Sequence, residues 1–155
     1  MRYWLMKSEP GSYSIDDLEA DGSTHWDGVR NYQARNFMQA MEVGDRVLFY
    51  HSSTKPLGVV GLAEVVTGSY PDHTSWDPDS HYFDEASTPD APRWFMVDIA
   101  FVEKFPRMVT LDEIRDHPDL AAMPLVNRSR LSVQPVTAEQ FDLIVDLAAE
   151  PDPGT

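Results

Sequence analysis

The sequence predicts a small α+β fold in which one hydrophobic core surrounds a mixed sheet. Apolar and aromatic positions mark about five or six short strands and about four helices. Strands and helices do not alternate strictly along the chain. This order favours a small mixed β-barrel with flanking short helices over a doubly wound parallel sheet. A length of 155 residues with 42% hydrophobic composition suits a single domain, placed at residues 1–149.

Five segments have the residue pattern of strands. Tyr3–Lys7 has side chains of alternating character and is rich in aromatic residues. Arg93–Glu103 is a longer strand whose two faces are both largely apolar. Arg46–His51 is apolar on both faces, which places it at the centre of the sheet. Val59–Val66 is β-branched with a glycine inside it, which indicates a bend. The segment 128–134 alternates so that two arginines and a serine would share one face of a strand.

Capping residues precede four expected helices. Ser14 and Thr137 each have an acid or amide three residues later, the pattern of a capping box. Thr110 opens a third helix in the same way, and Asn31 is the expected N-cap of a helix that ends near Met41. Between the strands, residues 70–92 hold prolines and six acids, so this excursion is expected to lack regular structure.

Composition restricts the location and the chemistry of the protein. The chain has no cysteine, which excludes disulfides, zinc fingers and a thiol nucleophile. The N-terminal apolar run is too short for a signal peptide, and no later run approaches membrane-spanning length. We therefore expect a cytoplasmic protein without membrane contact, a monomer, with a disordered tail at residues 150–155.

The formal charge of −14 argues against a protein that coats DNA without regard to sequence. The acids are unevenly distributed, however. Residues 28–41, 46–63 and 120–138 contain none, and together they hold six of the twelve lysines and arginines. This distribution indicates one neutral to basic face, on which a single base or nucleotide could dock.

Residues 25–36 form the strongest candidate for a binding site. A Trp-Asp-Gly turn at Trp26 meets the helix that Asn31 caps, and Arg35 lies one turn further along that helix. A helix N-terminus offers unpaired N–H groups to an anion or a heterocycle edge, and an indole offers a stacking surface. The alternative is purely structural, because an N-cap asparagine and a preceding tryptophan are also common in helix starts without a ligand.

Asp98 is unusual because it interrupts an apolar face of a predicted strand. A buried carboxylate is costly unless it is paired, so we predict a structural ion pair or a partner with several donors. Arg130 is one candidate partner; it is equally a candidate for binding a ligand phosphate.

The chain resembles the EVE domain family, a group similar in fold to PUA-like barrels and related to YTH domains. The resemblance spans residues 3 to 147 and rests on six segments: Tyr3–Pro10, Trp26–Asn36, Phe49–Ser52, Tyr70–Thr74, Trp94–Asp98 and Arg130–Pro135. It implies a module that binds modified bases in DNA or RNA. The loop 53–58 departs from the family pattern, so no contact is carried over to it.

The expected site combines this resemblance with the residues themselves. The resemblance implies that Lys7 and Ser8, at the end of the first strand, line the pocket and that Asn31 contacts a base edge. The base-binding pocket is then expected at Lys7, Ser8, Trp26, Val29, Asn31, Tyr32 and Tyr50. Tyr32, Tyr50 and Trp94 have a core role as their alternative. A pocket rim or phosphate contact is expected at Arg30, Arg35, Arg128, Arg130 and Ser132.

We therefore expect a non-catalytic reader of a methylated or hydroxymethylated base, with no cofactor and no metal. Two other classes stay open. His73, Asp77, Asp79, His81, Asp84 and Glu85 could suggest a metal-dependent enzyme, although they lack the spacing of a calcium loop. A protein-interaction module could instead use the acidic excursion as its contact surface.

Overall fold

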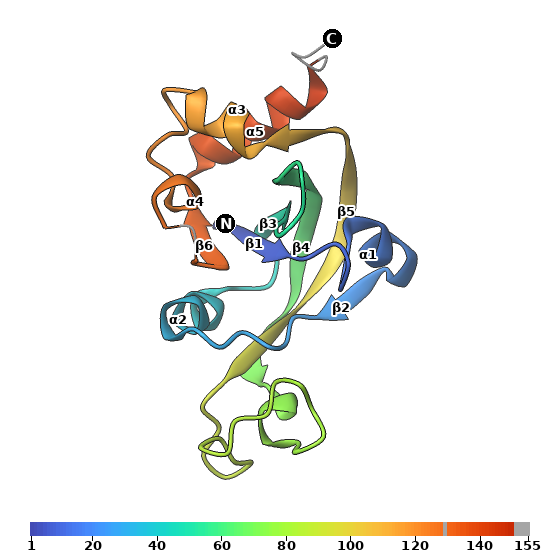
Figure 1. The fold of residues 1–155 in the computed structure, drawn as a ribbon, viewed down its shortest axis with the longest axis vertical. Coiled ribbons are helices and arrows are strands. Elements are labelled where there is room, and N and C mark those ends of the chain that lie inside the picture. The colour runs from blue at the N-terminus through green and yellow to red at the C-terminus, as the bar shows by residue number, and fades with distance from the viewer. Residues whose placement is uncertain (129, 151–155) are drawn as a thin grey trace.

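The computed structural model describes residues 1–128 and 130–150 and has one six-stranded sheet with five helices around it (Figure 1). The strands are β1 (Tyr3–Ser8), β2 (Ser23–His25), β3 (Arg46–His51), β4 (Gly58–Pro71), β5 (Phe95–Thr110) and β6 (Val133–Val136). The helices are α1 (Ile15–Asp21), α2 (Tyr32–Ala40), α3 (Leu111–Asp116), α4 (Pro124–Asn127) and α5 (Ala138–Ala149), with a 3₁₀ turn, η1 (His73–Trp76). The predicted α+β class is confirmed.

The sheet is mixed, and its strand order is β2-β5-β4-β3-β1-β6. β1 and β3 pair in parallel, and the remaining neighbours pair antiparallel. The expected closure into a barrel is not seen within residues 1–128 and 130–150, because the short strands β2 and β6 stand at opposite edges. Register shifts along the β4–β5 ladder bend the sheet without bringing these edges together.

Both faces of the central strand are buried, as its apolar run predicted. Phe49 of β3 packs into a first core cluster with residues of α1 and α2, such as Met38. Its neighbour Leu48 packs on the opposite face into a second core cluster with residues of α3 and α5, such as Ile144. Figure 1 shows α3 and α5 at one end of the molecule and the excursion between β4 and β5 projecting at the other end.

The predicted helix caps are present. Asn31 Oδ1 accepts a hydrogen bond from Ala34 N at 2.9 Å, and α2 buries Ala34 and Met38. Ser14 and Thr137 form capping boxes at α1 and α5. Thr110 caps α3 through Glu113 N at 3.2 Å. Local sequence thus determined where these four helices begin.

The predicted strand at 128–134 is confirmed only at Val133 and Gln134. β6 begins at Val133, whereas Arg130 lies in a turn whose Leu131 N–H reaches Arg128 O at 3.1 Å. α4, which starts with Pro124, was not expected, and it ends at Asn127. Ser129 and residues 151–155 of the expected tail lie outside the described residues. Glu150, the first residue of that tail, is described, and its carbonyl accepts a hydrogen bond from Arg107. No described helix is long and apolar enough to cross a bilayer.

His51, the last residue of β3, holds the start of α1. Its Nε2 accepts a hydrogen bond from Ile15 N at 3.1 Å, so the neutral imidazole caps the first turn of this helix. Burial lowers the pKa of His51 below its ordinary value of 6.5; nearby Asp16 opposes this effect and Lys104 reinforces it. A depressed histidine pKa stabilises the fold at high pH, and this contribution is lost as the pH falls through the folded-state pKa.

We predict that the free energy of unfolding declines between about pH 7.5 and about pH 5.5, and that His51→Gln reduces this decline. The variant should also be less stable at the higher pH by about 1 kcal/mol, since the cap hydrogen bond is perturbed. Denaturant unfolding at both pH values measures this. His73→Gln, at an exposed histidine, should keep the wild-type pH dependence. An unchanged pH dependence in the His51 variant would contradict the assignment.

Candidate ligand pocket

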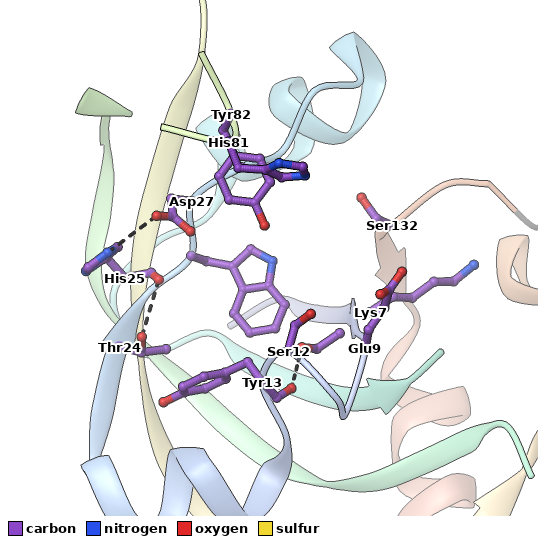
Figure 2. Close-up of a pocket in the computed structure, with 13 residues that line it drawn as sticks. Lys7, Glu9, Ser12, Tyr13, Thr24, His25, Asp27, His81, Tyr82 and Ser132 are labelled. Carbon is purple, nitrogen blue, oxygen red and sulfur yellow. Dashed lines mark hydrogen bonds and ion pairs between the residues drawn. The ribbon is translucent and has the colours of Figure 1, made fainter. Parts of the chain in front are cut away.

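A pocket of about 600 Å³ opens where the end of β1, the turn after β2 and the tip of the excursion converge (Figure 2). Figure 2 shows Tyr82 and Tyr13 on opposite sides of this pocket, with Ser132 on a third side. The lining residues are Lys7, Ser8, Glu9, Ser12, Tyr13, Thr24, His25, Trp26, Asp27, Gly28, His81, Tyr82 and Ser132. The volume is in the range of pockets that hold a small organic ligand.

Trp26 is a half-buried wall of this pocket. Its backbone N–H donates to Val97 O at 2.8 Å, which continues the pairing of β2 with β5. Its ring meets Phe49 edge to face, with centroids 5.5 Å apart and planes at 88°. The indole is therefore held from behind by the first core cluster while part of it borders the cavity. The indole is thus a preformed aromatic wall of the pocket.

Gly28 allows the chain to turn tightly beneath Tyr82. Its φ of +77° is in the left-handed region, which side chains rarely adopt. A Cβ at this position would also lie 2.7 Å from atoms of the Tyr82 ring. The glycine of the Trp-Asp-Gly turn is therefore required both by its backbone conformation and by the close approach of the aromatic wall.

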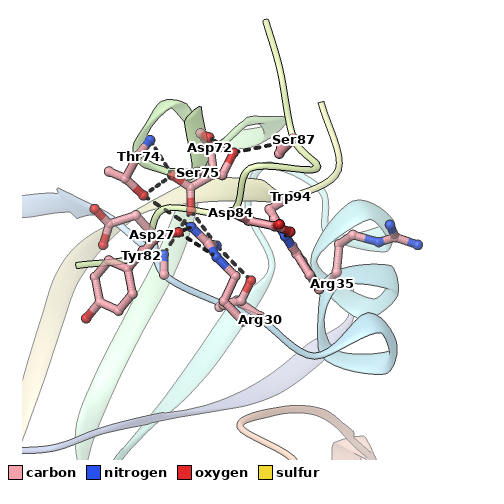
Figure 3. A network of polar contacts seen from close by, with 12 residues as sticks. Asp27, Arg30, Arg35, Asp72, Thr74, Ser75, Tyr82, Asp84, Ser87 and Trp94 are labelled. Atoms are coloured by element: carbon pink, nitrogen blue, oxygen red, sulfur yellow. Dashed lines mark hydrogen bonds and ion pairs between the residues drawn. The ribbon is translucent and has the colours of Figure 1, made fainter. Parts of the chain in front are cut away.

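Asp72 joins this turn to the excursion (Figure 3). Its carboxylate is fully buried and accepts from Gly28 N at 2.9 Å, from Thr74 N at 2.9 Å and from the Arg30 guanidinium at 3.1 Å. Burial acts to raise the pKa of Asp72, but these hydrogen bonds outweigh it and hold the pKa below the ordinary value. The carboxylate is thus an ionised anchor between two loops.

Arg30, an expected rim residue, is a structural residue instead. Besides pairing with Asp72, it donates to Tyr82 O through Nη2 at 2.6 Å and through Nε at 3.0 Å. Its guanidinium therefore fixes the backbone of the pocket wall. A cation engaged in this way is not available for a phosphate.

The pocket lining mixes donors and acceptors. The Asp27 carboxylate lies 3.5 Å from His25 Nε2, and Ser8 Oγ donates to Tyr13 O at 2.5 Å. Burial lowers the pKa of the Lys7 ammonium, whose Nζ is 5.8 Å from the Tyr50 ring centroid. A ligand with both donor and acceptor atoms at its edge would find partners here.

Four of the expected residues meet at this pocket: Lys7, Ser8, Trp26 and Ser132. Two others are in the core. Val29 is buried in the first core cluster, and Tyr50 is 2% exposed in the second core cluster. Because neighbours on a strand point to opposite faces, Tyr50 faces away from the indole that Phe49 supports.

Tyr32 and Arg35 form a separate stack with Trp94. The Tyr32 and Trp94 rings are 4.8 Å apart with planes at 26°, and the Arg35 guanidinium lies 4.8 Å from the Tyr32 centroid. Arg35 also donates to Arg93 O at 3.0 Å. This stack packs α2 against the end of the excursion, so Tyr32 is outside the pocket in which it was expected and Arg35 is outside the expected rim.

Asn31 and two expected arginines meet at a second, smaller pocket of about 250 Å³. It is lined by Asn31, Asn127, Arg128, Arg130 and Leu131. Arg128 donates to Gln33 Oε1, which holds it against α2. The segment from Arg128 to Ser132 thus contributes side chains first to this basic pocket and then to the larger one.

The expected ion pair of Asp98 is wrong. The Tyr70 hydroxyl donates a short hydrogen bond to Asp98, which is half-buried. Burial, followed by the hydrogen bond to this carboxylate, raises the pKa of Tyr70. A phenol therefore satisfies the carboxylate, and Arg130 lies at the second pocket. β4 extends further than its apolar run indicated, and this extension brings Tyr70 opposite Met96, near Asp98.

Tyr13, His81 and Tyr82 line the pocket but were not predicted to do so, and Asp27 belongs to the predicted stretch 25–36 without having been given a role. His81 and Tyr82 lie within the excursion 70–92, which was expected to lack regular structure. The one local feature that could have indicated their role is the adjacent aromatic pair Tyr82 and Phe83 beside acidic residues. Within the described residues, no three His, Asp or Glu side chains gather as metal ligands, and this includes the acidic run that suggested a metal site.

Comparisons with known proteins agree with this fold. The rat thymocyte nuclear protein 1 (Rattus norvegicus) is 46% identical over 169 residues, which cover 96% of this chain and 75% of that protein. The human protein of the same name (Homo sapiens) is 43% identical, covering 94% of this chain and 73% of that protein.

Two solved structures superpose over nearly the whole chain. One is human THYN1 in complex with DNA containing 5-methylcytosine, with a TM-score of 0.94 and 40% identity, covering 98% of this chain and 100% of that chain. The other, a hypothetical protein from Leishmania major, has a TM-score of 0.93 and 50% identity, covering 96% and 95%. The EVE domain matches residues 2–147. The chain therefore belongs to the EVE domain family, as its motifs indicated.

Proposed function

We propose that this protein is a non-catalytic module that binds a modified base, of the 5-methylcytosine type, extruded from DNA into the larger pocket. The observation that carries this proposal is the half-buried Trp26 indole bordering a pocket of about 600 Å³. It is supported by the shared fold with human THYN1, which was solved with 5-methylcytosine-containing DNA.

The pocket has the parts that an extruded base needs. Extrusion costs a few kcal/mol, and stacking on an aromatic ring returns about 1–3 kcal/mol per base. A methyl group adds about 0.8 kcal/mol of apolar burial that the plain base lacks. The Asp27 carboxylate can accept from the cytosine amino group, while the Ser132 hydroxyl can donate to the ring nitrogen or carbonyl.

The second pocket is proposed to hold a phosphate that flanks the extruded nucleotide. Arg130 lies there beside Arg128, on the segment that continues to Ser132 in the larger pocket. Arg128 is held by Gln33, so Arg130 is the better candidate for a bidentate phosphate contact. With a formal charge of −14, the chain should make few such contacts.

Binding to DNA also bears on location. The thymocyte nuclear proteins are named for the nucleus, whereas the sequence led us to expect a cytoplasmic protein. We propose that the protein acts where DNA is accessible to it, in a nucleus or in a cytoplasm that contains the chromosome. The expected monomeric state stays a prediction.

We predict that Trp26→Ala weakens binding to a duplex with one 5-methylcytosine by roughly 10- to 100-fold, because the stacking surface is lost. Wild-type protein should prefer this duplex to the unmodified one by roughly 4-fold, the contribution of one buried methyl group. Fluorescence anisotropy titration of both duplexes with both proteins measures these affinities.

Tyr32→Ala is the matched control for this experiment, because Tyr32 is an exposed aromatic residue that stacks on Trp94 rather than bordering the pocket. Its affinity should stay within about twofold of wild type. Equal affinities of wild type and the Trp26 variant for the methylated duplex would refute the proposed function.

For Arg130→Ala we predict a weaker salt dependence of binding. The slope of log affinity against log salt should fall in magnitude by about 0.9, the value for one lost phosphate contact. The loss should be similar for methylated and plain duplexes, because a phosphate carries no base identity. Lys55→Ala, at a different surface pocket, should leave the slope unchanged. An unchanged slope in the Arg130 variant would exclude the phosphate contact.

A further inference from the structure

Three consecutive aromatic rings stand exposed at the tip of the excursion, beside the mouth of the larger pocket. Tyr82 is 39% exposed and Phe83 is 44% exposed, and His81 precedes them. A tight turn brings them together: Phe83 N donates to Ser80 O at 3.2 Å, and Tyr82 N donates to Ser80 Oγ at 3.1 Å. A cluster of exposed rings differs from scattered single apolar residues and indicates a contact surface.

Two of the three rings belong to the pocket. Tyr82 packs over Gly28, and His81 meets Tyr82 edge to face with centroids 5.3 Å apart; both line the cavity. Among the residues that the structure describes, Phe83 belongs neither to the pocket lining nor to the two core clusters. Phe83 is thus an exposed aromatic residue that directly follows the pocket wall residue Tyr82 in sequence.

The backbone on both sides of Phe83 is anchored. Arg30 holds the Tyr82 carbonyl with two hydrogen bonds, at 2.6 and 3.0 Å. On the other side, Asp84 N donates to Ser75 O at 2.7 Å, and the Asp84 carboxylate accepts from Trp94 Nε1 at 2.7 Å. Because the backbone on both sides is anchored, Phe83 loses little backbone freedom when it binds.

The excursion can offer DNA stacking but not charge neutralisation. Residues 70–92 contain no lysine or arginine and six acids, so this segment would repel phosphates. An aromatic ring at its tip can gain instead from the apolar faces of bases. Duplexes accept such apolar wedges where a base step is unstacked.

We propose that Phe83 inserts into the duplex and fills the gap that the extruded base leaves in the stack. This inference rests on the proposed function, in which the base itself enters the pocket beside Tyr82. The wedge offsets part of the free energy lost on unstacking, so it acts on double-stranded DNA. A single strand has no paired stack to refill, and binding to it should not depend on Phe83.

The test compares Phe83→Ala with wild type on two ligands of the same sequence, a duplex and a single strand, each with one 5-methylcytosine. Phe83→Ala should lose at least about 10-fold in affinity for the duplex and stay within about twofold for the single strand. Phe83→Leu, which keeps an apolar wedge, should retain most duplex affinity. Trp26→Ala should weaken binding to both ligands.

Val43→Ala is the matched control, since Val43 is also an exposed apolar residue, and it should bind both ligands as wild type does. Circular dichroism confirms that each variant is folded. If Phe83→Ala loses affinity equally for both ligands, or loses none, the wedge is overturned. The proposed function still stands in that case if Trp26→Ala weakens binding. If Trp26→Ala also binds as wild type does, the proposed function fails and the wedge fails with it.

Discussion

The pocket depends on one buried carboxylate, Asp72. It collects hydrogen bonds from Gly28, Arg30 and Thr74, and through Arg30 it also determines where the Tyr82 carbonyl lies. A charge with no exposure is tolerated only while all its donors are present, and removal of one partner from a buried pair costs about 3–5 kcal/mol. The excursion and the Trp-Asp-Gly turn must therefore fold against each other as a unit. The position of the Tyr82 wall depends on this contact through Arg30, whereas Trp26 is held by Val97 and Phe49.

Local features of the sequence predicted much of the fold. The four consecutive residues Val47–Tyr50 of β3 are apolar, so side chains on both faces of this strand had to be covered. Caps such as Asn31 act within one helical turn, and for this reason they are visible in a single sequence. Trp26 was assigned to a binding site because a Trp-Asp-Gly turn meets a capped helix, and in the structure it lines the larger pocket.

The errors concern long-range contacts. Arg30 and Arg35 have the composition of a phosphate site, but their acceptors are Asp72 and backbone carbonyls more than forty residues away, and a single sequence gives no such pairing. Tyr50 was misplaced because its face depends on the register of β3 with β1 and β4. The lengths of β4 and β5 escaped prediction since their ladder continues through irregular, polar positions.

The acidic charge of the chain fits a reader of single bases better than it first suggests. A basic surface raises affinity for every DNA segment equally, whereas the genome offers a large excess of unmodified sites. In the proposed binding mode, repulsion by the excursion and by the rest of the acidic surface lowers that background affinity, and the pocket supplies the binding energy through Trp26 and the base edge. Discrimination depends on the difference between the two affinities, so weak binding to plain DNA is an advantage. Basic residues are needed only beside the pocket, where Arg128 and Arg130 stand.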